Sequence, residues 1–225
     1  MVTWDNYDAI FHNSAITHAL WVTALVTAGA TVLPILIASL AGYALAWIDF
    51  PGRDYVFVTI VGLMVVPIQM ALIPIFSLYN DTGLFDTVIG LVLFHVAFGL
   101  PFGIFLLRNF FIGLPKDILE SARIDGASEL TIFFRLILPL GLPAIASLAI
   151  FQFLWVWNDL LVALVFSNVK TQPLTVALQS NMRQFGSNID ILAPGAFLSL
   201  SVPLIVFFAF QRYFVQGLMA GSVKG

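Results

Sequence analysis

The chain has 225 residues, with nine Lys or Arg and twelve Asp or Glu, so 9% are charged and the formal net charge is −3. Apolar residues make up 60% and include 22 Phe, whereas an ordinary soluble domain is about 45–50% apolar and about 25% charged. A soluble fold of this size cannot bury so much apolar side chain. The composition therefore predicts a membrane protein. It disfavours nucleic acid as a partner because clustered cations are lacking, and the absence of Cys excludes disulfides and thiolate chemistry.

Five stretches contain no Asp, Glu, Lys or Arg, and each is at least 21 residues long. A helix needs about 20 apolar residues to cross the hydrocarbon core, so we expect an all-α membrane protein with five transmembrane helices. The first stretch contains Pro34 but no polar loop, and a proline kink is tolerated in a span, so we expect one helix there. The predicted spans, within a single transmembrane domain of residues 1–225, are 16–48, 56–79, 87–107, 137–166 and 192–212.

The distribution of Lys and Arg predicts the orientation of these spans. Seven of the nine cations fall on the side of the loop at 49–55, the segment 108–136 and the C-terminal tail, and only Lys170 and Arg183 fall on the other. Short cytoplasmic loops carry the excess of positive residues. We therefore expect a multi-pass protein of the cell (inner) membrane with an external N-terminus and a cytoplasmic C-terminus. Since no cation precedes Arg53, the start is not a signal peptide, and we expect one further helix before Met1; a natural start outside the membrane is the alternative.

Residues 108–136 form the one long charged segment on the cytoplasmic side and are expected to contain two short helices. Gly126 is placed to end the first helix at positive φ, and Ser128 to cap the second. An amphipathic hairpin lying on lipid is one interpretation. Mixed charge on the first helix favours docking to another protein instead, because anionic lipid selects an excess of cations. The apolar face expected on the second helix comprises Leu130, Phe133, Phe134, Ile137 and Leu138.

The same segment carries a recognisable motif. Glu120-Ser121-Ala122, three residues, Gly126, nine residues and Leu136-Ile137-Leu138-Pro139 resembles the EAA motif (E-A-A-x3-G-x9-I-x-L-P) of ABC-importer permeases. Ser121 and Leu136 depart from it conservatively. The string from Ser121 to Ser128 is similar to the carbohydrate branch, the maltose-type second permease family. Further similar pieces are Asp5-Asn6-Tyr7, Phe50-Pro51-Gly52-Arg53, Trp157-Asn158-Asp159 and the C-terminal run from Gln211 to Gly225.

This resemblance implies the type I ABC-importer permease fold, with the chain matching family helices two to six and carrying a cytoplasmic coupling helix pair. It implies a second permease subunit, a cytoplasmic ATPase dimer and an extracytoplasmic solute-binding protein as partners, in a lipid membrane. ATP and Mg would be bound by the ATPase, with no cofactor in this chain. The positions that the resemblance assigns to ATPase docking are Glu120, Ser121, Ala122, Asp125, Gly126, Ala127, Lys224 and Gly225.

Polar residues inside or next to the spans are candidates for a translocation path, because burying them is costly. Hydrogen bonds that only help helix packing are the alternative for His95 and the two glutamines. Trp155 and Trp157 are expected to belong to an interfacial aromatic belt. The path candidates are Gln69, His95, Gln152, Asn158 and Asp159.

No phosphate loop, metal-binding pair or nucleophile elbow is found in the sequence, so a membrane enzyme is disfavoured. We expect a permease subunit of an ATP-driven importer for sugars or oligosaccharides, with the solute unidentified. Polyols or glycerol phosphate are alternative solutes. A stand-alone secondary transporter is a further alternative, disfavoured because no matching halves are visible.

Overall fold

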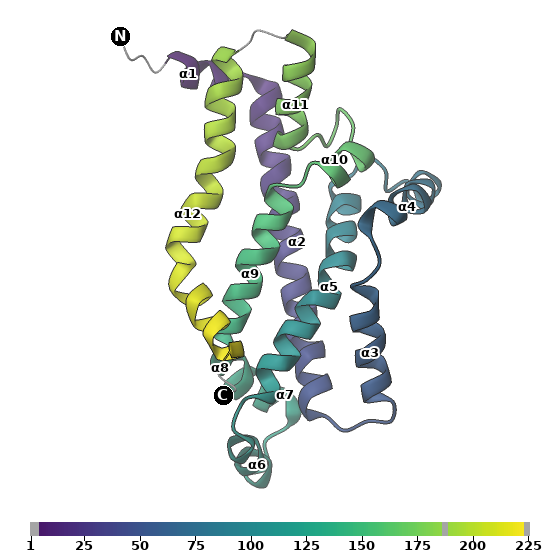
Figure 1. Cartoon of the computed structure of the whole chain (residues 1–225), viewed down its shortest axis with the longest axis vertical. Helices are drawn as coiled ribbons and strands as arrows, with labels where there is room; N and C mark the ends of the chain where they lie inside the picture. Colours follow the sequence, from purple (N-terminus) through teal and green to yellow (C-terminus); the bar gives the residue numbers. More distant parts are fainter. Residues whose placement is uncertain (1–4, 186–188, 223–225) are drawn as a thin grey trace. The chain divides into compact units, whose positions relative to one another are not determined.

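A computed structural model describes the backbone of residues 5–185 and 189–222, and every regular element in these ranges is a helix. The chain divides into two compact units, the first made of Met1–Ala30, Ile68–His95 and Phe153–Ala209 and the second of Thr31–Pro67, Val96–Gln152 and Phe210–Gly225. The elements are α1 (Asp5–His12), α2 (Ser14–Trp47), α3 (Arg53–Leu63), α4 (Ile68–Thr82), α5 (Val88–Ile112), α6 (Lys116–Ile124), α7 (Glu129–Ile132), the π-helix η1 (Phe133–Ile137), α8 (Leu138–Leu140), α9 (Leu142–Trp157), α10 (Leu161–Phe166), α11 (Leu174–Phe185) and α12 (Ile189–Ser222) (Figure 1).

The first unit groups α1 and α11 around the start of α2 (Figure 1). Ile10, Ile16 and Leu174 form its small buried cluster, and Leu178 and Leu198 pack on it. These five apolar side chains come from four different helices. The cluster therefore joins α1, α2, α11 and α12 by burial of side chains alone.

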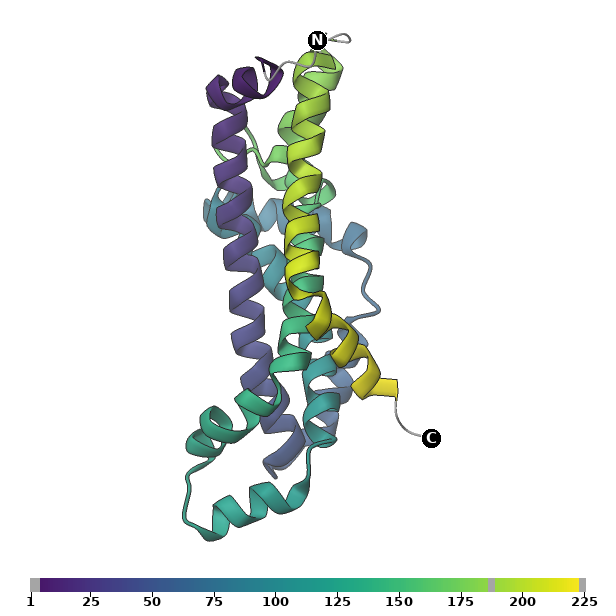
Figure 2. The same ribbon diagram turned by 90° about the vertical axis from the view of Figure 1, so that its left-hand side faces the viewer.

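The second unit has a larger core, which binds the end of α2 to α5 and to the segment that follows α5. Leu107, Phe111, Leu119 and Ile137 are almost completely buried in it. Figure 2 shows the hairpin of α6 and α7, in teal, extending past the ends of α2 and α5. Residues 116–134, which comprise this hairpin and the two residues after it, are called the coupling hairpin below.

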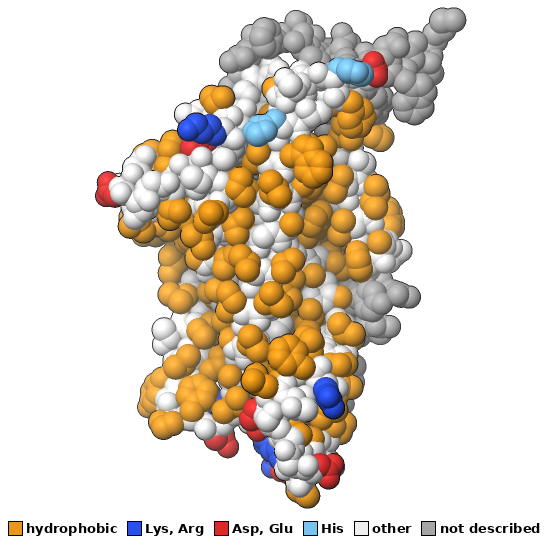
Figure 3. Space-filling view, turned by 180° about the vertical axis from the view of Figure 1, so that it is seen from behind, with side chains coloured by type: hydrophobic (Ala, Val, Ile, Leu, Met, Phe, Trp, Pro, Cys, Tyr) orange, Lys and Arg blue, Asp and Glu red, His pale blue; other side chains and the backbone are white. Residues whose placement is uncertain are grey.

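Long apolar helices agree with the membrane prediction. Within the described residues, three helices are long and apolar enough to cross a membrane, or five if each of two bent pairs counts as one span. Pro34 lies inside α2, as expected for one kinked helix. Hydrophobic side chains cover most of the face in Figure 3, with charged side chains in small groups, so the surface of the chain suits lipid or another apolar partner.

Two predicted spans are bent rather than straight. Residues 53–82 form α3 and α4 at 95° to each other, and residues 129–157 bend by 73° between Leu140 and Leu142. Proline explains the first break, because Pro67 has no amide hydrogen and disfavours helix in the residue before it. The straight part of the fourth predicted span therefore begins at Leu142, and a second break at residues 158–160 separates α9 from α10.

The coupling hairpin has the two predicted helices and the predicted turn. Gly126 has φ +79°, the Ala127 amide donates to Ala122 O and the Gly126 amide donates to Arg123 O, which is the Schellman end of a helix. Ser128 Oγ accepts from the Thr131 amide at 3.3 Å. Both sequence predictions for this turn are confirmed.

The predicted apolar face of the second helix is partly wrong. Leu130 and Phe134 are exposed, whereas Phe133 and Ile137 are buried together with Ile132. The regular α-helical spacing assumed in the prediction fails because residues 133–137 form a π-turn, which widens the repeat and places Ile132 and Ile137, five residues apart, on the buried side.

Candidate functional site

The outer surface of the coupling hairpin carries most of the residues predicted to dock an ATPase. Glu120, Ser121, Asp125 and Gly126 are exposed, and Ala122 and Ala127 are half-buried. Lys224 and Gly225 lie outside the described residues. Glu120 is paired with Lys116 at 2.8 Å, and this pair raises the pKa of Lys116 and lowers that of Glu120. Four of the six docking positions that the structure describes are therefore accessible.

Large apolar side chains stand on the same hairpin. Ile124 is 85% exposed, Leu130 64% and Phe134 57%. Exposed apolar groups of this size on a charged segment indicate an interaction surface. We call Ile124, Leu130 and Phe134 the apolar triplet of the hairpin.

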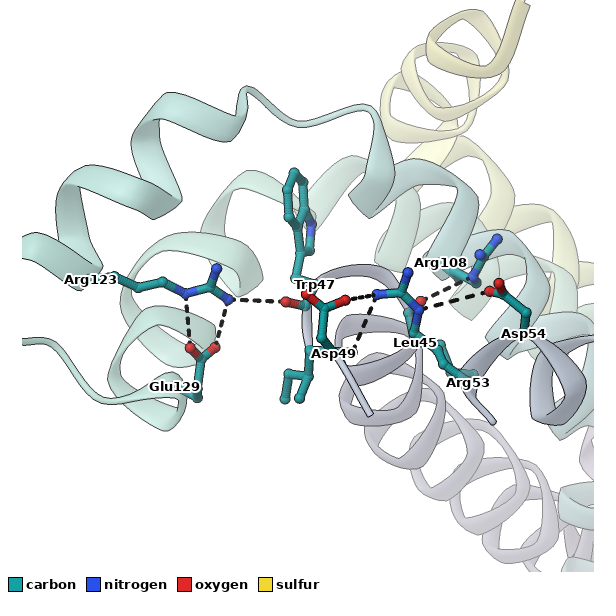
Figure 4. A network of polar contacts seen from close by, with 9 residues as sticks. Leu45, Trp47, Asp49, Arg53, Asp54, Arg108, Arg123 and Glu129 are labelled. Atoms are coloured by element: carbon teal, nitrogen blue, oxygen red, sulfur yellow. Dashed lines mark hydrogen bonds and ion pairs between the residues drawn. The ribbon is translucent and has the colours of Figure 1, made fainter. Parts of the chain in front are cut away.

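The inner side of the hairpin is held by a polar network that the sequence analysis did not find (Figure 4). Arg123 of α6 donates to both carboxylate oxygens of Glu129, at 2.9 and 3.3 Å. Its Nη2 also donates to the carbonyl of Trp47 at 3.0 Å, and Tyr43 Oη donates to Glu129. The network therefore joins the two helices of the hairpin to each other and to the end of α2.

Electrostatics follow from this geometry. The hydrogen bonds from Arg123 outweigh the cost of partial burial and lower the pKa of the Glu129 carboxyl, and the Tyr43 hydroxyl adds to the effect. The same bonds raise the pKa of Arg123. Both side chains are ionised at neutral pH, so their pair is charge-assisted and two-pronged, which is the stronger class of hydrogen bond.

Three arginines from different segments meet the last carbonyls of α2 (Figure 4). Arg108 Nε donates to Leu45 O at 3.2 Å, Arg123 Nη2 to Trp47 O, and Arg53 Nη1 to Ile48 O at 3.4 Å. A helix leaves its final carbonyls without helical partners and carries partial negative charge there. The arginines satisfy both needs at once. Asp49 accepts from Arg53 at 2.7 Å.

The sequence did contain a feature that indicates a polar network at the end of α2. Tyr43 and Trp47 lie one helical turn apart at the end of the first predicted span, where polar aromatic tips seek partners, and a helix terminus of that kind attracts cations. What the sequence did not provide was the identity of the cations, because Arg108 and Arg123 are distant in sequence from α2.

In the first unit, two path candidates meet. His95 is buried, and its Nε2 lies 3.7 Å from Asp159 Oδ2. His95 Nδ1 donates to Leu91 O at 2.8 Å, because a carbonyl can only accept. The Trp155 ring packs edge-on to the imidazole at 5.1 Å between centroids. Both path candidates are thus held in one packed cluster rather than displayed on an open surface.

Asp159 also caps α10. Its two carboxylate oxygens accept from the amides of Val162 and Ala163 at 3.2 and 2.9 Å, and its carbonyl accepts from Thr175 Oγ1 at 2.6 Å. The residue therefore connects α5, α10 and α11.

The remaining path candidates differ in their exposure. Gln69 is exposed at the start of α4, and Asn158 is exposed and donates to Leu154 O at 2.8 Å. Gln152, in the second unit, is buried against Gly99. The belt prediction is wrong for Trp157, which is buried and donates to Ser199 O at 3.0 Å, because the indole nitrogen finds its partner inside the unit.

Asp86 is a second carboxylate that the sequence analysis did not select. Its Oδ1 accepts from the Asn168 amide at 2.8 Å, the Thr171 amide at 3.1 Å and Thr171 Oγ1 at 2.7 Å. Burial raises the pKa of this carboxyl, but the hydrogen bonds from Thr171 and the loop amides outweigh it, and the pKa is lowered. Asp86 therefore fixes the loop after α10.

Apolar helices interrupted by bends, together with a charged hairpin that has an accessible outer surface, fit the membrane-embedded permease that the sequence analysis expected. Among the residues that the structure describes, no group of three or more His, Asp or Glu is placed to hold a metal ion. Residues 20–219 match the family described as "Binding-protein-dependent transport system inner membrane component", and the chain belongs to this family.

Several relatives are permease proteins of named transport systems. The chain is 51% identical to the alpha-glucoside transport system permease protein AglG of Rhizobium meliloti over 230 residues, which cover 99% of this chain and 60% of that relative. It is 36% identical to the arabinooligosaccharides permease AraQ of Bacillus subtilis, covering 100% and 80%. It is 35% identical to the trehalose permease SugB of Mycobacterium tuberculosis, covering 100% and 83%.

Solved structures show the same fold. A bacterial ABC transporter that imports the acidic polysaccharide alginate matches with a TM-score of 0.80 at 24% identity, over 95% of this chain and 80% of that one. The MetNI methionine ABC transporter matches with a TM-score of 0.68 at 17% identity, over 90% and 96%. The chain has the ABC-importer permease fold that the sequence analysis expected.

Proposed function

We propose that the chain is a membrane-spanning permease subunit of an ATP-driven importer for sugars or oligosaccharides. The observation that carries the proposal is the coupling hairpin, which presents the exposed apolar triplet and the motif residues Glu120, Asp125 and Gly126 on one accessible segment. Relatives named as permeases for alpha-glucosides, arabinooligosaccharides and trehalose support a carbohydrate as the solute.

In this proposal a cytoplasmic ATPase dimer binds ATP and Mg and docks on the hairpin. A second permease completes the path, and an external solute-binding protein delivers the sugar. The excess of Lys and Arg on the side of the hairpin supports a cytoplasmic hairpin and an external N-terminus. Since the chain contains no Cys, single cysteines introduced at Asp125 and Val169 test this orientation. Labelling from outside whole cells should modify position 169 and not position 125; the reverse pattern would exclude the proposed orientation.

The docking step is tested by replacing one exposed apolar residue on the hairpin and one elsewhere. Ile124→Asp and Val169→Asp form a matched pair, because the two side chains are 85% and 83% exposed. We expect Ile124→Asp to reduce co-purification of the host's ATPase subunit at least tenfold at equal membrane abundance, with Val169→Asp near wild type. Equal co-purification by both variants would contradict docking on the hairpin.

The solute is tested by deleting the gene in its host and measuring uptake of labelled trehalose, maltose, arabinooligosaccharides and glycerol phosphate. Loss of uptake for a sugar or oligosaccharide supports the proposal. Selective loss of glycerol phosphate uptake would replace the solute class and leave the permease role intact.

A further inference from the structure

The coupling hairpin contributes apolar side chains to the core of the second unit. Leu119 is the one buried residue of α6, and the other buried side chains of the segment, Ile132 and Phe133, follow the turn. Burial of these apolar side chains holds the hairpin against the core, but the hydrophobic effect is not directional. Another interaction is needed to fix how α6 is oriented relative to α2.

Arg123 supplies that directional contact. Its Nη2 donates to the Trp47 carbonyl at 3.0 Å and to Glu129 Oε2, while its Nε donates to Glu129 Oε1. Tyr43 donates to the same carboxylate. Four groups from α2, α6 and α7 are therefore joined in one network, of which Figure 4 shows Trp47, Arg123 and Glu129. A guanidinium is planar and presents its donors in a fixed fork, so it can bind both partners only in a narrow range of orientations.

The start of the hairpin is tied to the same turn of α2. Trp47 Nε1 donates to Phe111 O at 2.9 Å, and Phe111, at the end of α5, is completely buried. Trp47 thus holds α5 through its side chain and α6 through its carbonyl. A displacement of α6 that keeps these bonds must displace the end of α2 as well.

We propose that Tyr43, Trp47, Arg123 and Glu129 are positioning residues that transmit movement of the coupling hairpin to α2. The inference rests on the proposed function, because it supposes that an ATPase moves the hairpin. It gives the four residues a role in transmitting movement rather than in docking, because they join α6 and α7 to α2. The apolar triplet is the docking surface. Cutting the network should then leave ATPase binding intact while uncoupling it from transport.

A second ion pair on α6 provides the control. Lys116 and Glu120 are 2.8 Å apart, about as close as Arg123 and Glu129, but their side chains are 70% and 50% exposed. Among the described residues, Lys116 makes no hydrogen bond or ion pair with α2. Lys116→Gln therefore removes an ion pair of similar length from the same helix without touching the network.

The first measurement needs no partner. Spin labels on cysteines introduced at Leu40 of α2 and Asp117 of α6, both exposed, report the distance between the two helices in the purified chain in lipid nanodiscs. We expect one narrow distance distribution for the otherwise unchanged chain and for Lys116→Gln, and a distribution at least twice as broad for Arg123→Gln. Equal widths for the two variants would overturn the positioning role.

The second measurement separates coupling from docking. We expect Arg123→Gln to keep co-purification of the host ATPase within threefold of wild type while uptake of the sugar falls at least tenfold. Tyr43→Phe removes a single hydroxyl and should show a smaller defect of the same kind; it serves as the test if Arg123→Gln does not accumulate. Arg123→Lys keeps a cation but not the fork, and we expect an intermediate uptake.

The outcomes are distinguishable. Normal uptake with Arg123→Gln or Tyr43→Phe overturns the inference, and so does loss of ATPase binding in parallel with uptake, because the network would then belong to the docking surface. If the wild-type chain itself binds no ATPase, the proposed function fails, whereas the spin-label result still decides whether the network orients α6.

Discussion

Asp159 at the start of α10 lies with its Oδ2 3.7 Å from Nε2 of His95 on α5. Its carboxylate also accepts the amides of Val162 and Ala163. One side chain therefore serves both as helix cap and as a partner of a buried imidazole.

We expect Asp159→Ala to lower the Tm of the purified chain in detergent. Losing a helix-capping carboxylate costs about 0.5–2 kcal/mol, and the partner of His95 is lost as well. Asn80→Ala is the control, because Asn80 is exposed and its amide donates only to Phe76 O within its own helix. Thermal unfolding followed by Trp fluorescence measures both. Equal Tm values for the two variants would show that the cap adds nothing.

Gly126→Val is expected to weaken ATPase docking beyond its effect on the chain itself. An L-residue at the φ of +79° found here costs about 1–2 kcal/mol, more if β-branched, while no atom of the chain lies within 4 Å of an added Cβ. Gly83→Val has the same character, with φ +71° and open space. The Tm should fall by a similar amount in the two variants. Only Gly126→Val should reduce co-purification of the ATPase, by roughly tenfold for each 1.4 kcal/mol of binding free energy lost.

Gly99 and Gln152 are predicted to depend on each other. A Cβ built on Gly99 would lie 2.5 Å from the Gln152 side-chain nitrogen and 2.6 Å from its oxygen, so Gly99→Ala overpacks the site and should cost about 1–3 kcal/mol. Combining it with Gln152→Ala removes the obstructing amide. A double-mutant cycle of Tm values should therefore show non-additivity, as contacting residues do; strictly additive effects would rule out the close contact.

Asp86 should make the stability depend on pH. Its hydrogen bonds with Thr171 and the loop amides outweigh burial and lower the pKa of the folded carboxyl. A lowered folded pKa means that the stabilisation is present above the unfolded pKa and is lost as pH falls through the folded pKa. Asp86→Asn tolerates the φ of +53° found here, so it should lower Tm at pH 7, and the difference from wild type should shrink as pH falls below about 4. A difference that stays constant with pH would argue against the carboxylate.

The membrane class, the long apolar helices and the turn of the hairpin followed from the sequence because each is a local property. Hydrophobic length sets a span, and Gly126 and Ser128 carry the conformational preferences of a helix end and a cap. The bends at Pro67 and Gly141 were missed in part, because a proline in a span is compatible with either a kink or a break, and tertiary packing decides between them.

The networks could not be predicted, because they join residues far apart in the chain. Arg123 and Tyr43, or Asp86 and Thr171, meet only when separate helices pack, and nothing local distinguishes Arg123 from Arg135. The π-turn after Ile132 was missed for a similar reason: the apolar residues fit a regular helix equally well, and only the core selects which of them face inward.

The short helix α10 has a consequence for how the first unit opens. Six residues are too few to form a stable helix alone, since nucleation is costly. Asp159 anchors its first amides, and Asp86 accepts amides of the loop that follows, while its own amide donates to Phe166 O at 3.0 Å. The amides of Val162 and Ala163 therefore exchange with deuterium only when Asp159 releases them. Because Asp159 also contacts His95 of α5 and Thr175 of α11, the exchange rate measures the cooperative opening of the unit rather than local fraying.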